Sequence, residues 1–381
     1  MIVWAEGVVT EIRARWAGAV ELLATRDNET ACRALAYTDL VPAPEPGDRL
    51  LLNVAALDRG LGTGGYALVV AVLTADGHLK GQPPTPRGHL VKARYLPMQA
   101  MVAGADEQGS PYHDLLAEAT DLADMPVVVA DLHSALAPIV AAVHADRPGT
   151  RVVYVMSDHG ALPLAFSRTV AQLREAGLVA ATVTVGQAFG GDLEAVNVHS
   201  GLLAAHLALD ADLVVLTQGP GNLGTGTRWG FSGVACGEAV NATATLGGRP
   251  IGSLRISGAD QRARHRGVSH HSLTAYGQVA LKAADLAVPD LAGAERLAGI
   301  AGLNEVAALA PAVIEAAETL SRHRRVLVAL DGLDTALLDL PVRLSTMGRG
   351  LDDDPAYFLA AAASGRLAAQ LLSATAPGSV G

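Results

Sequence analysis

The sequence predicts an α/β protein with a small N-terminal β-barrel-like domain in residues 1–85 and a doubly wound, mainly parallel sheet in residues 86–381. Two patterns lead to this prediction. Short, alternating apolar runs fill the first part, and from residue 126 onward strongly apolar runs alternate with helical segments. Runs that are apolar on both faces and separated by helices are typical of a parallel sheet covered on both sides. The second part is therefore expected to be Rossmann-like.

Composition and net charge exclude several classes of protein. Of the 381 residues, 50% are hydrophobic and 17% charged, as in a well-packed globular protein. A formal net charge of −10 opposes binding to nucleic acid or to an anionic membrane, because like charges repel. The two cysteines, Cys32 and Cys236, are too few for a disulfide framework. With neither a signal peptide nor a membrane-length apolar run in the sequence, a cytoplasmic protein is expected.

The first part of the chain is expected to be β-structure. Strands are predicted for residues 8–16, 19–24, 34–38, 49–53 and 66–73. In the first of them Glu11, Arg13 and Arg15 share one face, because side chains alternate along a strand. Short strands at this spacing predict a small barrel or compact sheet. The Pro/Gly-rich stretch 81–88 then predicts a domain boundary.

The second part is expected to alternate strand and helix. Strands are predicted for residues 127–130, 151–156, 181–185, 212–217, 251–256 and 326–330. Helices are predicted for residues 114–122, 234–246 and 356–372, with the acids at 352–354 as caps of the last one. The Ala/Leu-rich stretch 287–319 is expected to be helical and to cover the sheet or form a dimer surface.

Small, polar or ionisable residues follow every strand predicted for the sheet. They are Asp131–Ser134, Ser157–Gly160, Gly186–Glu194, Gln218–Gly233, Ser257–Asp260 and Asp331–Gly332. Each alone is more often a turn or a helix cap. Ligands bind outside the carboxyl ends of parallel strands, so the recurrence predicts a site. The segments of Gly160, Gly190, Gly221 and Asp260 are expected to border one cavity at one edge of the sheet.

The stretch Gln218–Gly233 holds six glycines in sixteen residues. Glycine lets the backbone approach a ligand, and exposed N–H groups before a helix favour an anion. Arg228 adds a planar cation that the loop is expected to shield partly from water. The candidate ligand-binding residues of this kind are Gly190, Gly191, Gly219, Gly221, Gly224, Thr225, Gly226, Thr227 and Arg228. A long structural turn is the alternative.

Known nucleotide motifs fit this loop poorly. No lysine stands where a P-loop needs one. Gly219, Gly221 and Gly224 match the dinucleotide pattern in spacing, but the predicted helix does not begin at the third glycine. No cofactor is therefore assigned.

Residues 262–271 contain three arginines and three histidines. Arginine suits phosphate or carboxylate, and histidine can transfer protons near neutral pH. A solvated basic turn is the alternative. The candidate ligand-binding residues here are Arg262, Arg264, Arg266 and His271, and the candidate proton-transfer residues are Asp158, His265 and His270.

The sequence carries no metal-binding motif. Adjacent histidines such as His270 and His271 are poor joint ligands unless the backbone bends, and no helix carries a His-Glu-x-x-His pattern. No metal ligand is therefore assigned. A mixed oxygen and imidazole set from Asp158, His159 and His270, as in a metal-dependent hydrolase, remains an alternative.

Three segments also carry a resemblance to a known family. Residues 186–197, 219–233 and 264–271 resemble a bacterial family known as a domain of unknown function, and the resemblance extends over almost the whole chain. It implies no activity, substrate or cofactor, so the site residues rest on the chemistry of the side chains.

These patterns together favour an enzyme or binding protein for a small anionic metabolite, phosphorylated or nucleotide-like, working as a homo-oligomer such as a homodimer. Binding to nucleic acid or membrane is not expected. A metal-dependent hydrolase is one alternative. The other is a non-catalytic metabolite sensor that contacts a partner through its β domain.

Overall fold

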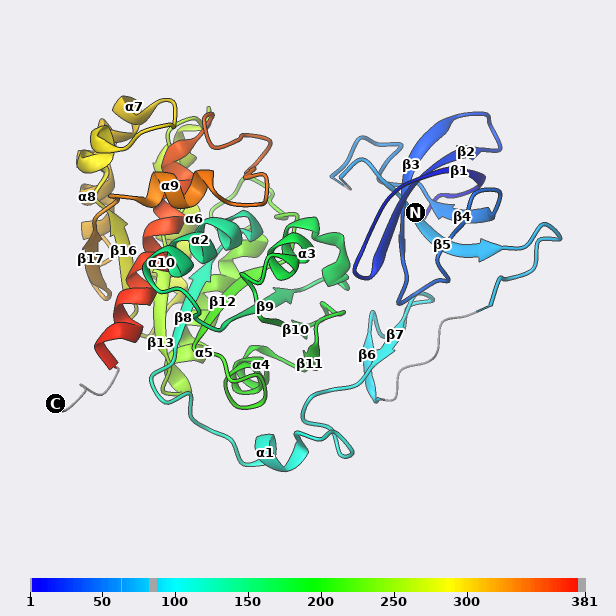
Figure 1. Ribbon diagram of the computed structural model, residues 1–381, viewed down its shortest axis with the longest axis horizontal. Coiled ribbons are helices and arrows are strands. Elements are labelled where there is room, and N and C mark those ends of the chain that lie inside the picture. Colours follow the sequence, from blue (N-terminus) through cyan, green and yellow to red (C-terminus); the bar gives the residue numbers. More distant parts are fainter. Residues whose placement is uncertain (1, 63, 82–87, 376–381) are drawn as a thin grey trace. The chain divides into compact units, whose positions relative to one another are not determined.

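The computed structural model describes residues 2–62, 64–81 and 88–375, and the chain forms two compact units (Figure 1). The barrel unit comprises Met1–Val102 and Pro163–Ala171, and the sheet unit comprises Ala103–Leu162 and Gln172–Gly381. Most of the predicted boundary stretch 81–88 lies outside the described residues.

Five strands of the barrel unit close into a barrel, as the sequence predicts. They are β1 (Trp4–Trp16), β2 (Ala19–Arg26), β3 (Ala31–Tyr37), β4 (Arg49–Asn53) and β5 (Ala67–Leu73), in the order β1-β2-β3-β5-β4. Pairing of β1 with β4 closes the ring. Leu22, Leu50 and Leu52 are wholly buried in its core, as expected for alternating strands with one face inside. A short hairpin of β6 (Leu90–Lys92) and β7 (Ala100–Val102) follows.

A segment distant in sequence completes the barrel unit. Residues 163–171 follow β9 (Val152–Asp158), include the first turn of α3 (Arg168–Glu175) and belong to the barrel unit. The indole nitrogen of Trp16 donates to the carbonyl oxygen of Ala165 at 2.7 Å, and the guanidinium of Arg168 lies 5.1 Å from the centre of the Trp16 ring. The fold of this unit therefore depends on residues beyond its strands.

The sheet unit is built on eight parallel strands in the order β11-β10-β9-β12-β8-β13-β16-β17. The strands are β8 (Pro126–Ala130), β9 (Val152–Asp158), β10 (Ala181–Gly186), β11 (Leu193–Ala195), β12 (Leu213–Gln218), β13 (Arg249–Ser253), β16 (Asp285–Pro289) and β17 (Arg324–Val328). The central strands β8 and β12 are buried along their whole length, which explains why their sequences are mainly apolar. The predicted parallel α/β fold is confirmed.

Helices cover both faces of this sheet. On one face α2 (Leu136–Asp146) packs against α10 (Pro355–Thr375) and α9 (Leu333–Leu338). On the other, α5 (Ala235–Thr245) packs against α4 (Val198–Leu203). The connection from β8 to β9 through α2 and that from β12 to β13 through α5 run in opposite directions along the sheet. Because such crossovers are right-handed, α2 and α5 must lie on opposite faces.

Three predictions in the sheet unit were wrong in detail. The stretch 287–319 was expected to be helical, but it begins inside β16, which is buried between β13 and β17. A short apolar run does not distinguish a buried strand from a helix. Only afterwards does the chain form a 3₁₀ turn at Leu291–Arg296 and the helices α7 (Leu303–Ala307) and α8 (Ala310–Glu318).

The second error concerns the strand predicted for residues 251–256. The sheet strand β13 ends at Ser253, and β14 (Ile256–Ser257) instead pairs antiparallel with β15 (Gly267–Val268). This small hairpin leads into α6 (His270–Thr274). The helix predicted for residues 114–122 is also shorter, as α1 (His113–Ala117). Within the described ranges, no helix is both long and apolar enough to span a membrane.

Candidate functional site

The topology places a switch point at the carboxyl edge of the sheet. Neighbouring strands β12 and β8 send the chain to opposite faces, and such a switch point separates the loops that follow them. Asp131 follows β8 and Gln218 ends β12. The side-chain amide of Gln218 donates to the carbonyl oxygen of Asp131 at 2.6 Å and to the Oδ1 atom of Asn222 at 3.0 Å. It thereby joins the two strand ends to the glycine loop, residues 218–233.

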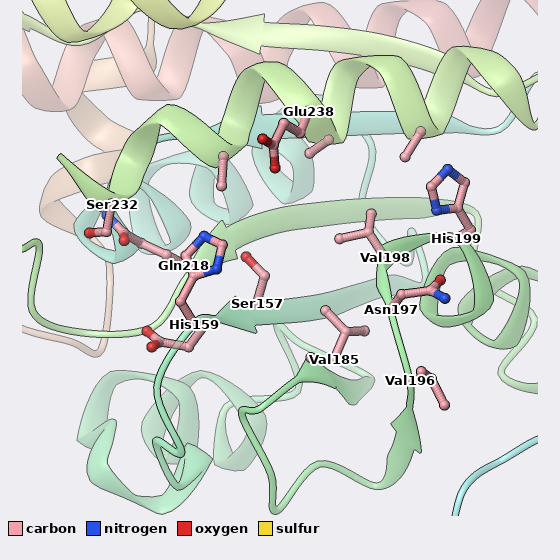
Figure 2. Close-up of a pocket in the computed structure, with 15 residues that line it drawn as sticks. Ser157, His159, Val185, Val196, Asn197, Val198, His199, Gln218, Ser232 and Glu238 are labelled. Carbon is pink, nitrogen blue, oxygen red and sulfur yellow. The ribbon is translucent and has the colours of Figure 1, made fainter. Parts of the chain in front are cut away.

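A pocket of about 270 Å³ lies next to this switch point, at the ends of β9, β10 and β12 (Figure 2). Figure 2 shows Glu238 reaching from α5 toward Gln218 and His159. The polar and ionisable lining side chains are Ser157, Asp158, His159, Asn197, His199, Gln218, Ser232 and Glu238. Among the described residues that line it, none is a lysine or an arginine. The pocket therefore suits an uncharged or polar group better than an isolated anion.

Asp158 is the predicted proton-transfer residue that lies in this pocket. It ends β9, and its Oδ1 atom accepts a hydrogen bond from the backbone N–H of Gly160 at 2.7 Å. Burial raises the pKa of the Asp158 carboxyl above its ordinary value. A carboxyl group in this setting is suited to exchange a proton with a bound molecule.

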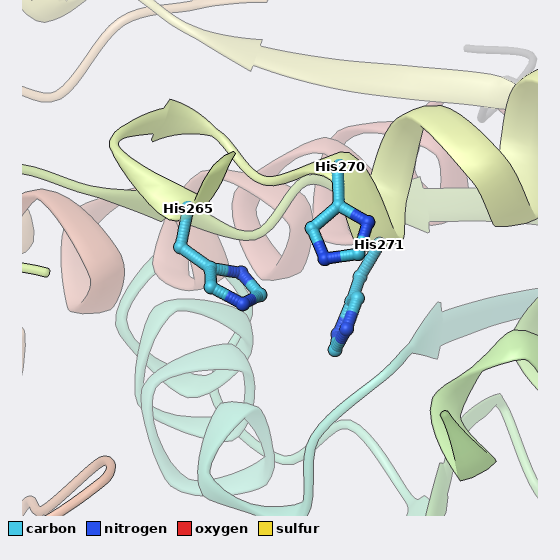
Figure 3. A group of neighbouring side chains, drawn as sticks. All are labelled: His265, His270 and His271. Carbon is cyan, nitrogen blue, oxygen red and sulfur yellow. The ribbon is translucent and has the colours of Figure 1, made fainter. Parts of the chain in front are cut away.

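His265, His270 and His271, here termed the histidine cluster, lie together (Figure 3). One ring nitrogen of each lies within 4.8 Å of one ring nitrogen in each of the others. The hairpin of β14 and β15 folds His265 back toward the start of α6, where the other two histidines lie. Ser269 caps α6: its hydroxyl accepts from the backbone N–H of His271 at 3.2 Å and lies 2.7 Å from the Nδ1 atom of His265.

Two histidines of the cluster, His265 and His270, are uncharged at neutral pH. Burial, reinforced by the charge of Arg255, lowers the pKa of His265 to about 3. Burial, together with the neighbouring His271 and then Arg264, lowers the pKa of His270 to about 4. At pH 7 both rings are therefore neutral imidazoles, and each has one unprotonated nitrogen with a free lone pair.

A buried ion pair contacts the histidine cluster at His271. Asp131 and Arg255 are each 4% exposed, and Nη1 of Arg255 lies 3.6 Å from Oδ2 of Asp131. The same carboxylate oxygen lies 3.6 Å from Nδ1 of His271, and Arg255 also donates to that nitrogen at 3.2 Å. The ring of Phe231 stacks on His271 with centres 3.7 Å apart. The cluster thus touches both the strand end of β8 and the glycine loop.

Two polar atoms in this region lack hydrogen-bond partners within the described part of the chain. They are Oδ2 of Asp131 and Nε2 of His270, and both are buried. Leaving a buried polar atom unpaired costs about 1–3 kcal/mol, so such atoms are rare in folded proteins. Their presence side by side with His265 and His271 marks a place where a ligand would supply the missing interaction.

The glycine loop is held largely by its own side chains. Oδ1 of Asn222 accepts from the hydroxyl of Ser232 at 2.9 Å and from the N–H of Gly233 at 3.3 Å. The hydroxyls of Thr225 and Thr227 lie 3.1 Å apart. Gly219 is buried, and a Cβ there would come within 2.4 Å of the Leu162 side chain. That glycine serves packing.

The tip of the loop is open to solvent. Gly221, Gly224, Gly226 and Arg228 are all exposed. The expected shielding of Arg228 is therefore wrong, since the whole stretch 223–229 is exposed. A contact made by this arginine is weakened by water and by salt.

Gly190 and Gly191 form the turn between β10 and β11. The N–H of Gly190 donates to Oε1 of Glu194 at 2.6 Å, and that of Gly191 donates to Oγ1 of Thr184 at 3.0 Å. A Cβ on Gly191 would lie 2.8 Å from the backbone nitrogen of Thr184. Close packing accounts for Gly191, and Gly190 adopts a positive φ of 93° that favours glycine. The N–H groups of both are already engaged.

The arginines of residues 262–266 differ in their pairing. Arg262 makes a two-pronged ion pair with the buried Asp260, at 2.9 and 2.7 Å, so its charge is balanced. Arg264 and Arg266 are exposed. Nη2 of Arg264 lies 3.6 Å from the point where a Cβ of Gly226 would stand. Arg264 therefore connects the histidine cluster segment with the glycine loop.

The segments expected to border one cavity do so in part. The segments of Gly160, Gly190, Gly221 and Asp260 follow β9, β10, β12 and β13 in the chain. The pocket takes in residues next to the first three, but the described lining does not include Asp260. Nor does a metal-ligand group among the described residues combine Asp158, His159 and His270; the group found is the histidine cluster.

Sequence reasoning missed Arg255 and Asp354. Arg255 was hidden inside the strand predicted for residues 251–256. Asp354 was taken for a helix cap, yet its carboxylate accepts from the hydroxyl of Ser257 at 2.6 Å, from the N–H of Gly258 at 3.0 Å and from Nε of Arg349 at 3.1 Å. It fixes the start of the Asp260 segment, and only its burial distinguishes it from a cap.

No curated protein and no solved structure shows significant similarity to the chain. A family model described as a protein of unknown function (DUF3866) matches residues 33–365, which is nearly the whole length and includes the glycine loop and the histidine cluster. The chain belongs to this DUF3866 family.

Proposed function

We propose that the sheet unit binds a small metabolite with an uncharged body and one anionic group, at the carboxyl edge of the sheet. The observation that carries this proposal is the position of Arg264. Its guanidinium lies beside the glycine loop at Gly226, and its charge also acts on the nearby His270. An exposed arginine next to uncharged imidazoles and backbone amides is suited to receive phosphate or carboxylate.

The pocket would hold the rest of the ligand. Its lining is free of lysine and arginine among the described residues, and it carries the two carboxylates Asp158 and Glu238, so an anionic end belongs elsewhere. The pocket adjoins the histidine cluster, beside which Arg264 lies. Ser232 lines the pocket, while the preceding Phe231 stacks on His271. A phosphorylated or nucleotide-like ligand would extend from the pocket to Arg264.

Asp158 is the residue best suited to chemistry on such a ligand. It lines the pocket, and its raised pKa brings its proton exchange closer to neutral pH. If the protein is an enzyme, Asp158 would transfer a proton to or from the ligand body. If it is a sensor, replacement of Asp158 would alter affinity alone.

The test begins with a thermal-shift screen of nucleotides, sugar phosphates and acyl-CoAs, because a ligand that binds only the folded state stabilises it. Calorimetry then measures the affinity of the best ligand for Arg264→Ala. We expect binding about two- to fivefold weaker, since an exposed charge-assisted contact is worth up to about 1 kcal/mol. The loss should shrink at higher salt.

Arg13→Ala is the matched control. Arg13 is an exposed arginine of the barrel unit that pairs with Glu11, so its removal changes the net charge equally. It should leave the affinity unchanged. Equal affinities for the parent and Arg264→Ala would remove the basis of the anion site.

A further inference from the structure

We propose that His265, His270 and His271 bind one divalent transition-metal ion of the zinc type, each through one ring nitrogen, with at least one coordination position left open. The inference goes beyond the proposed function and does not depend on it. Imidazole is a preferred ligand of zinc and its neighbours, whereas magnesium and calcium prefer oxygen. The three rings face a common space in Figure 3.

The spacing needs only a small contraction. The ligand nitrogens lie within 4.8 Å of one another. Around a tetrahedral zinc ion with Zn–N bonds of about 2.0 Å, they would be about 3.3 Å apart. Metal binding would therefore bring these nitrogens closer together by up to about 1.5 Å. His270 and His271 begin α6 with their ring centres 4.5 Å apart, and the hairpin brings His265 to them.

The lone pairs are available. Nε2 of His270 is buried and has no hydrogen-bond partner within the described part of the chain. His265 is engaged through Nδ1 with the hydroxyl of Ser269, which directs its Nε2 elsewhere. A ligating histidine almost always donates its second ring nitrogen to an oxygen, and Ser269 supplies that oxygen here.

Asp131 would orient the third ligand. Its Oδ2 atom is buried without a hydrogen-bond partner among the described residues and lies 3.6 Å from Nδ1 of His271. With Nε2 of His271 on the metal, the ring proton would reside on Nδ1 and be donated to Asp131. Arg255, which donates to Nδ1 of His271 in this structure, would then pair with the same carboxylate. This arrangement is the carboxylate–histidine–metal triad of many metal sites.

The charge balance around the cluster favours an anion as the fourth ligand of the metal. Arg255 is balanced by Asp131, and Arg262 by Asp260. Three neutral imidazoles do not offset the charge of a divalent ion. Hydroxide, or an anionic ligand group near Arg264, would offset it. Three protein ligands with an open position are typical of catalytic zinc sites, in which the ion makes bound water more acidic.

Metal binding can be measured without a substrate. The full-length chain, stripped with chelator, is dialysed against micromolar Zn²⁺ and its metal content determined, and Co²⁺ is added in parallel to record visible absorption. We expect one metal ion per chain and a cobalt spectrum of a nitrogen-ligated site. His265→Ala and His270→Ala should each lower metal affinity by at least about a hundredfold, since loss of even a supporting residue costs about 10–100-fold.

His78→Ala is the matched control, because His78 is an exposed histidine of the barrel unit, and it should bind metal like the parent. His270→Gln provides a second variant of similar size, with circular dichroism as the folding check. Asp131→Asn should weaken metal binding about 10–100-fold through the orientation of His271. Substoichiometric metal in the folded parent would overturn the proposal. Unchanged affinity in the folded His270 variants, or loss only in His159→Ala, would do the same.

Discussion

Two buried aspartates of the sheet unit differ in how completely they are paired. Asp285, at the start of β16, accepts hydrogen bonds from Arg324 at 2.5 and 2.6 Å and from Arg249 at 2.9 Å. Asp131 has Arg255 at 3.6 Å and one oxygen without a hydrogen-bond partner in the described structure. The first carboxylate is fully engaged in holding three strands together. The second retains capacity for a ligand, which is why the candidate site lies beside Asp131.

The pairing of Asp285 predicts a pH-dependent stability. Burial alone would raise its pKa, but the hydrogen bonds from Arg324 and Arg249 outweigh burial and hold the pKa below its ordinary value. A lowered folded-state pKa stabilises the fold above the unfolded pKa of about 3.9 and loses this effect as pH falls further. Asp285→Asn should therefore be about 1–3 kcal/mol less stable at pH 7, with a smaller deficit at pH 3.

Urea unfolding of parent and variant at pH 7, 5 and 3 measures this difference. Asp331→Asn is the control, because Asp331 pairs with Arg296 on the open surface and should change stability little. A deficit for Asp285→Asn that is equal at all three pH values would assign the effect to packing alone.

At the scale of elements, the sequence predicts what depends on local patterning. The barrel strands and the central sheet strands follow from apolar periodicity, and β4 was predicted with its observed bounds at residues 49–53. The β16 strand was not, because its short apolar run, residues 286–288, is compatible with strand or helix until neighbours decide. The strand β11 was missed for the same reason, being only three residues long.

In the candidate site, too, local sequence predicts some residues and the tertiary fold determines the others. The cationic segment 262–271 stands out in sequence by composition, and the structure brings its histidines together. Its partners do not stand out, since Asp131 and Arg255 are 124 residues apart and Asp354 follows Ser257 by 97. Such contacts arise only when the sheet order is known, and no periodicity encodes that order.

The packing of α10 on α2 gives an element-scale prediction. A Cβ on Gly365 of α10 would lie 2.1 Å from the carbonyl oxygen and 2.9 Å from the carbonyl carbon of Ile139 in α2. Because both contacts are backbone, the helices must separate to admit a methyl group. Overpacking of this kind costs about 1–3 kcal/mol, so Gly365→Ala should lower the melting temperature by several degrees.

Gly224→Ala is the matched control for that substitution. The nearest atom to a Cβ at Gly224 is the Gly230 carbonyl oxygen at 3.8 Å, and the residue is exposed. Calorimetry should show little change in its melting temperature. Similar melting temperatures for both variants would mean that α10 and α2 are less closely packed than described.

At the scale of the whole molecule, the candidate chemistry belongs to the sheet unit alone. The pocket, the glycine loop and the histidine cluster all belong to this unit and gather around the carboxyl edge of one sheet. Sheets of this kind place their ligands there because the loops diverge at the switch point. The barrel unit has its own closed core, completed by residues 163–171, and provides none of these residues.

Hydrogen–deuterium exchange of the full-length chain tests this account most directly, with and without the best ligand of the screen. Binding at the carboxyl edge should slow exchange of backbone amides in residues 218–233 and 260–271, because ligand contacts reduce local opening. Strands β1 to β5 of the barrel unit should exchange as before. Protection confined to the barrel strands, with residues 218–233 and 260–271 unchanged, would contradict the central claim.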